Sequence, residues 1–179
     1  MSLLAAVCGG VLAGASFFFA LAETALFSLG KWQARRLVER SPQRGGLVAR
    51  LLGSPQDLLA TIVLGNTCAN AGLVTVGLWM VLRGEWSPVV TPIVVLLVIL
   101  VGGEVIPKTL AVRAPESWSL RVARPMLFVL AATRPARQVA QRLNQRLLDW
   151  LIPKSIRPPS VTTAEDYAEL LDLAYQQGA

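Results

Sequence analysis

The chain has 179 residues, of which 54% are hydrophobic and only 16% are charged. Soluble domains have about 45–50% apolar and about 25% charged residues, so this composition indicates a membrane protein. The net charge of +6 would also suit a nucleic-acid-binding protein, but the basic residues stand beside apolar runs, which favours membrane topology and predicts no nucleic-acid partner. The chain has no histidine and two cysteines, both inside apolar runs. A disulfide, a thiolate metal site and enzymatic chemistry are therefore not expected.

The first apolar run covers residues 3–29 and exceeds the ~20 residues that cross a bilayer. No basic segment precedes it, so we expect a retained membrane span rather than a cleaved signal peptide. Residues 31–50 are basic and amphipathic. They predict two short helices on the membrane surface, with breaks at residues 41–42 and 45–46.

A second span is predicted for residues 58–82. The tetrapeptide SPQD just before it predicts the helix start, with the serine as N-cap and the proline at the first helical position. A short loop over residues 83–88 leads to the third apolar run, residues 89–112.

The remainder of the chain changes character, because arginines alternate with apolar residues after residue 115. This pattern predicts amphipathic helices that form a belt on the membrane surface. We therefore expect a transmembrane domain with juxtamembrane belt helices over residues 1–152 and a linker over residues 153–160. Residues 161–179 carry acidic but no basic side chains and predict the first helix of an acidic cytoplasmic bundle.

The predicted fold is an all-α membrane protein with three transmembrane helices per subunit. The loop after the first span and the whole segment after the third are basic, so the positive-inside rule places them in the cytoplasm of a cell (inner) membrane. The N-terminus is then outside and the C-terminus cytoplasmic. A face of small residues on the second span predicts either a homodimer contact or close packing within one subunit; its members are Gly65, Ala69, Gly72 and Gly77.

Polar residues interrupt the first and second spans. Glu23, in FFALAETALFSL, is the only charge in the first span, and an intramembrane ionisable residue is a candidate cation ligand or coupling-ion site. The alternative is a carboxylate near the cytoplasmic end, paired with Lys31 or an arginine. Asn66 and Asn70, in LGNTCAN, lie one turn apart and offer hard oxygen ligands suited to Mg²⁺ or Na⁺. Hydrogen bonding between helices is the alternative here.

The third span closes with GGEVIPKTLA, which combines glycines, a carboxylate and a proline. Pro107 has no N–H to donate to the carbonyl of Gly103, and the glycines permit unwinding. A freed carbonyl in lipid must be satisfied by protein, water or an ion. We therefore expect a broken third helix that presents the Gly103 carbonyl beside Glu104 to a cation. The alternative is a proline kink with Lys108 extending to the headgroups.

The order of ETALFSL, GNTCAN and GEVIPKTLA, followed by a basic amphipathic belt, resembles the transmembrane domain of the CorC/CNNM (cyclin M-like) magnesium transporters. The resemblance implies a homodimer in a lipid bilayer that exports Mg²⁺ from an inward-facing polar cavity, driven by Na⁺. It also implies that cytoplasmic CBS domains, which bind ATP, follow the segment seen here. By motif it assigns the ion site to Asn66, the backbone of Gly103, and Glu104 with Pro107.

One position departs from the family pattern. Members that this chain resembles read Phe-Ser-Gly-Ser-Glu-Thr where this chain reads FALAET, so Ala20 stands where a serine ligand is expected. Ser16, one turn away, can replace it; otherwise water or a carbonyl does so, or a different ion is moved. The alternative functions are a cation-sensing regulatory or scaffold protein that transports nothing, and a lipid-interacting structural protein. The candidate metal site comprises Asn66, Gly103, Glu104, Asn70, Glu23 and Ser16, with structural or gating roles for Pro107, Lys108 and Ala20.

Overall fold

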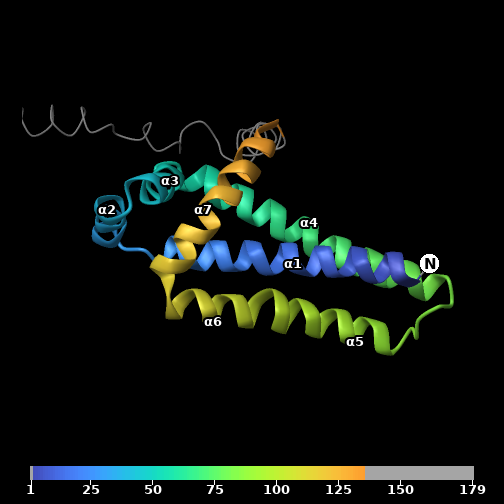
Figure 1. The fold of residues 1–179 in the computed structure, drawn as a ribbon. Helices are drawn as coiled ribbons and strands as arrows, with labels where there is room; N and C mark the ends of the chain where they lie inside the picture. Colours follow the sequence, from blue (N-terminus) through green and yellow to red (C-terminus); the bar gives the residue numbers. More distant parts are fainter. Residues whose placement is uncertain (1, 136–179) are drawn as a thin grey trace, which may run out of the picture. The chain divides into compact units, whose positions relative to one another are not determined.

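The computed structural model describes residues 2–135, and this range contains helices and no strand (Figure 1). Three helical rods are long and apolar enough to cross a membrane. They are α1 (Ser2–Phe27), α4 (Pro55–Leu82) and a third rod that runs through α5 (Val90–Leu97), η1 (Val98–Val105) and α6 (Ile106–Arg113). The prediction of an all-α membrane protein with three candidate spans is therefore confirmed.

Helix α1 is the central element of the three rods. It packs against α4 on one side and against η1 and α6 on the other, while α5 contacts α4 (Figure 1). Side chains of the second and third spans that meet near α1 can therefore also contact the side chains of α1.

The third rod is continuous, so the predicted break is not an unwound gap. Instead the helix changes type, and Val98–Val105 forms a π-helix in which the N–H of Ile106 donates to the carbonyl of Val101. In a π-helix each carbonyl pairs with the N–H five residues later, rather than four. With this spacing the carbonyl that lacks a donor at Pro107 is that of Gly102, five residues earlier, rather than that of Gly103.

Three further helices lie beside the end of α1 that is farther from the N-terminus (Figure 1). They are α2 (Lys31–Arg40), α3 (Pro42–Leu52) and α7 (Pro115–Ala132). The predicted break at residues 41–42 is confirmed, because α2 ends at Arg40 and Ser41 separates it from α3. The predicted break at residues 45–46 is wrong, since both glycines lie inside α3.

Gly45 serves helix packing instead of a helix break. It is buried where α3 crosses α2, and a Cβ atom there would overlap the backbone carbonyl of Leu37. Only glycine allows the two helices to approach this closely.

The buried core lies where the second half of α1 meets α3, α7 and the start of α4. The hydroxyl of Ser119 on α7 is fully buried and donates to the carbonyl of Ala25 on α1 at 2.8 Å. Away from this core, large apolar side chains of the spans are exposed, which suits contact with lipid; among them are Leu3, Val11, Leu82, Val89 and Leu96.

The small-residue face of α4 packs within the chain. A Cβ at Gly65 would overlap the ring of Phe19, one at Gly72 would lie 2.9 Å from the side chain of Leu12, and one at Gly77 would lie 3.0 Å from that of Val95. The small-residue face of α4 is thus covered by α1 and α5. This agrees with the sequence interpretation in which the face packs within one subunit. The homodimer stays a prediction that needs another surface.

The predicted start of the second span can be compared with the structure, whereas the predictions for the C-terminal part of the chain cannot. Ser54 is the N-cap residue of α4 and Pro55 follows it in the first turn, but the Ser54 side chain makes no capping hydrogen bond. The belt after residue 135, the linker at residues 153–160 and the acidic tail at residues 161–179 lie outside the described residues.

We expect Gly45→Ala to destabilise the protein by about 1–3 kcal/mol, because the new methyl group meets backbone that cannot move away without separating α2 from α3. Gly46→Ala is the matched control. Nothing lies within 4 Å of its Cβ position, and alanine is the better helix former by up to about 1 kcal/mol. Thermal unfolding in detergent measures both, and equal midpoints for the two variants would contradict the assigned contact.

Candidate functional site

Ser16 is the centre of a polar cluster between the three rods. It is fully buried in α1, and its Oγ lies 2.9 Å from Oδ1 of Asn66 and 2.8 Å from Oδ1 of Asn70 on α4. A serine hydroxyl has one proton, so it can donate to only one of these two amide oxygens at a time. Three oxygen atoms therefore converge with one proton among them.

The Asn66 amide joins this hydroxyl to the third rod. Its Nδ2 donates to Oε1 of Glu104 at 3.3 Å, which orients the amide so that Oδ1 faces Ser16. The carboxylate of Glu104 is thus held by a neutral donor on one oxygen. Its side chain keeps 31% of its surface exposed, so it is not sealed off.

Lys108 contacts the other carboxylate oxygen. Its Nζ lies 2.6 Å from Oε2 of Glu104, one turn away in the same rod. The Lys108 side chain is 46% exposed, so it borders the cluster. The structure pairs Lys108 with Glu104, and its extension to lipid headgroups stays an untested alternative.

Gly103 brings the backbone of the π-helix against α1. A Cβ atom at this position would lie 2.7 Å from Oγ of Ser16, inside van der Waals contact. Glycine is required here because the hydroxyl occupies the space of a side chain. The neighbouring Gly102 has nothing within 4 Å of its Cβ position.

Glu23 and Ala20 lie on α1 outside the direct contacts of the cluster. Among the side chains that the structure describes, Glu23 makes no hydrogen bond or salt bridge, but its charge is close enough to interact with that of Lys108. The side chain of Lys31, its alternative partner, is not among those described. Ala20 is 1% exposed and one turn from Ser16.

The structure thus brings together Ser16, Asn66, Asn70, Gly103 and Glu104. Hydroxyl, amide and carboxylate oxygens are the ligands that hard cations such as Mg²⁺ and Ca²⁺ select. Residues 2–135 contain no group of three or more His, Cys, Asp or Glu side chains that could hold a metal. Any cation held here would therefore depend on neutral oxygens and a single carboxylate.

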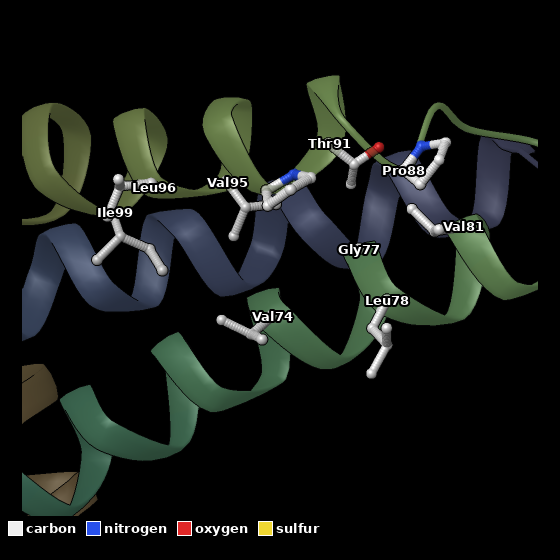
Figure 2. A pocket seen from close by; sticks show the side chains of 10 residues that line it. Val74, Gly77, Leu78, Val81, Pro88, Thr91, Val95, Leu96 and Ile99 are labelled. Atoms are coloured by element: carbon white, nitrogen blue, oxygen red, sulfur yellow. The ribbon is translucent and has the colours of Figure 1, made fainter.

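A cavity of about 460 Å³ lies elsewhere, between α4 and α5 (Figure 2). Its walls are aliphatic side chains such as Val74, Val81 and Ile99, and Thr91 supplies the one hydroxyl (Figure 2). It offers no set of ligands for a cation, so the polar cluster is the better functional candidate.

The contact between Glu104 and Lys108 was not predicted from the sequence, and the role of Ser16 was underestimated. The spacing of Glu104 and Lys108 is i to i+4, which is the usual spacing of a helical ion pair, and that signal was present in GGEVIPKTLA. Ser16 entered only as a substitute for Ala20. No local pattern shows that its face of α1 meets both asparagines.

The structure combines three apolar helices with a polar cluster between them, which consists of a hydroxyl, two amides and a carboxylate. These features define a helical membrane protein with an intramembrane polar cluster. The chain belongs to the cyclin M family, because the model of the cyclin M transmembrane N-terminal domain matches residues 9–179.

Curated relatives carry family names. The chain is 33% identical over 159 residues to a chloroplastic DUF21 domain-containing protein of Arabidopsis thaliana, covering 87% of this chain and 24% of that protein. It is 30% identical over 118 residues to the UPF0053 inner membrane protein YfjD of Escherichia coli, covering 65% and 27%. A UPF0053 protein of Synechocystis is 30% identical over 167 residues, covering 88% and 44%. The chain thus spans about a quarter of the length of the first two of these relatives.

We expect Gly103→Ala to lower the free energy of unfolding by about 1–3 kcal/mol, because the methyl group forces Ser16 away from its amide partners. Gly102→Ala makes the same chemical change one residue earlier in open space and should be neutral or stabilising. Thermal unfolding of the two variants side by side checks this. A Gly103→Ala variant as stable as Gly102→Ala would mean that Ser16 does not depend on the glycine.

Proposed function

We propose that this chain binds Mg²⁺, or a similar hard divalent cation, between its three spans and moves it out of the cytoplasm, with Na⁺ as the coupling ion. The carrying observation is the convergence of three oxygen atoms, from Ser16, Asn66 and Asn70, with a single proton among them. Such a cluster has lone pairs to spare for a cation. No covalent chemistry is part of this function.

The neutral oxygens and the carboxylate have different roles. Ser16, Asn66 and Asn70 replace part of the hydration shell, while Glu104 supplies the negative charge that draws a cation into an apolar region. We propose the backbone carbonyl of Gly103 as a further ligand, and the close approach of Gly103 to Ser16 supports this. Mg²⁺ loses water reluctantly, so a site with few protein ligands keeps some of its waters.

The distribution of charge supports a topology in which the basic end of the spans faces the cytoplasm. The arginines of α2, α3 and α7 lie at one end of the spans, and the loop between α4 and α5 at the other end carries Arg83 and Glu85 (Figure 1). By the positive-inside rule the end with α2, α3 and α7 is cytoplasmic and the N-terminus is outside. A homodimer, and regulation by ATP-binding CBS domains, belong to this proposal for the longer protein.

A second candidate is a cation-sensing regulatory protein that does not transport. The observation in its favour is Ala20, which has no oxygen at the position of the expected serine ligand. A site with one ligand fewer binds Mg²⁺ more weakly, and weak binding suits a sensor. Flux separates the two functions, because a sensor binds the cation and moves none.

Ion flux into and out of proteoliposomes containing the full chain tests the proposal, with Mg²⁺, Mn²⁺ and Co²⁺ compared in the presence and absence of a Na⁺ gradient. We expect protein-dependent Mg²⁺ movement that increases when Na⁺ is supplied on the opposite side. Mg²⁺ binding by calorimetry without flux would favour the sensor instead.

Ser16→Ala should weaken Mg²⁺ binding by about tenfold, since a lost ligand or hydrogen bond to a charged group is worth about 1.5 kcal/mol or more. Thr75→Val is the control. It also removes a hydroxyl from a span, but one that bonds only to the carbonyl of Ala71 in its own helix. Calorimetric titration with Mg²⁺ measures both dissociation constants, and equal values for the two variants would remove Ser16 from the site.

Ala20→Ser should strengthen Mg²⁺ binding, because it returns a hydroxyl one turn from Ser16 on the same face of α1. Ala20 is buried, so the new oxygen must face protein or ion rather than bulk solvent. The measurement is the same titration. An unchanged dissociation constant would show that this position does not face the ion.

A further inference from the structure

We propose that Lys108 is a tethered cation that competes with the transported cation for Glu104 and so promotes its release. The inference rests on the proposed function, because it concerns how the same site is loaded and emptied. Lys108 acts through Glu104 and is a positioning residue rather than a ligand.

The first step is the geometry of the carboxylate. Glu104 has two oxygens, and one accepts from the Asn66 amide while the other contacts the Lys108 ammonium at 2.6 Å. Mg²⁺ coordinates oxygen at about 2.0–2.1 Å, so an ion on this carboxylate and an ammonium on the same group would be only a few ångströms apart. Two positive charges at that separation repel each other. The ion therefore binds well only after the ammonium has moved away.

The second step is that Lys108 is free to move. Its side chain is 46% exposed, and its long flexible stem lets the ammonium turn without any change in the backbone of α6. No other hydrogen bond or salt bridge of Lys108 is found among the described residues.

The third step is that a second carboxylate, that of Glu23, can accept the Lys108 ammonium. Glu23 on α1 interacts electrostatically with Lys108, and α1 packs directly against α6. Among the described side chains, which do not include that of Lys31, Glu23 has no hydrogen bond or salt bridge of its own. When a cation occupies Glu104, the ammonium can remain near Glu23, and when the cation leaves, the ammonium can return to Glu104.

The charge count supports this exchange. Glu104, Glu23 and Lys108 together carry one net negative charge when no cation is bound, and a bound divalent ion reverses the sign of that sum. The ammonium neutralises Glu104 whenever the site is empty, so that the carboxylate beside Asn66 is not left unpaired between apolar helices, which would be costly. The same contact weakens the affinity for the incoming ion, because the ion must displace it.

The test is Mg²⁺ titration of the full chain in lipid nanodiscs, together with flux in proteoliposomes. Lys108→Gln should tighten the Mg²⁺ dissociation constant by about tenfold and lower both the apparent KM and the maximal flux. Lys108→Arg, which keeps the charge, should stay within about threefold of the wild type. Glu23→Gln removes the second acceptor and should weaken Mg²⁺ binding.

Arg113→Gln is the control, because it removes one positive charge from the end of the same rod and should leave the dissociation constant unchanged. Loss of a merely structural ion pair would weaken binding or leave it unchanged, and would not tighten it. Wild-type binding that Glu104→Gln abolishes and Lys108→Gln leaves unchanged would overturn this inference alone. If neither the wild type nor Lys108→Gln binds Mg²⁺, the proposed function fails and the inference with it.

Discussion

The structure depends on the hydrogen bonds of one buried hydroxyl. Between apolar helices there is little water to satisfy a polar atom, so each one must find its partner within the protein. Ser16 meets this constraint by lying within hydrogen-bonding distance of both asparagines of α4. Because the same hydroxyl also fills the space beside Gly103, its position fixes α1 against the second and third spans together.

Small residues make this arrangement of α1 possible. Phe19 packs against Gly65 and Leu12 against Gly72, so large side chains of α1 enter spaces that glycines leave open on α4. At the other end of the core, Ser119 donates to the backbone carbonyl of Ala25 and attaches helix α7 to the spans. Without a hydrophobic driving force between helices in lipid, close packing and such hydrogen bonds are what hold them together. The helix that carries Ser16 is therefore also the one that connects the spans to α7.

The helices could be predicted from the sequence because apolar length and periodicity are local properties. The three spans, the break at Ser41 and the polar residues themselves all followed from residues close in the chain. The contacts were harder to predict. Gly45 permits close packing rather than breaking a helix because the backbone of Leu37 lies against it. The small-residue face of α4 meets α1 rather than another subunit because Phe19 packs there, and this depends on tertiary structure. The site residues were found through their chemistry, but the central role of Ser16 depends on which helix faces meet.

The π-helix shows how the chain reconciles a proline with an apolar environment. A gap at Pro107 would have freed backbone groups in a region without water, whereas the longer hydrogen-bond spacing keeps the rod continuous. The wider turn also allows neighbouring residues to serve different helices, since Gly103 lies against Ser16 of α1 while Glu104 bonds to Asn66 of α4. Long π-helical segments are uncommon, and those that persist are frequently found at functional sites. The irregular part of the third span is thus the part that carries its carboxylate, and Pro107 removes one backbone N–H just after it.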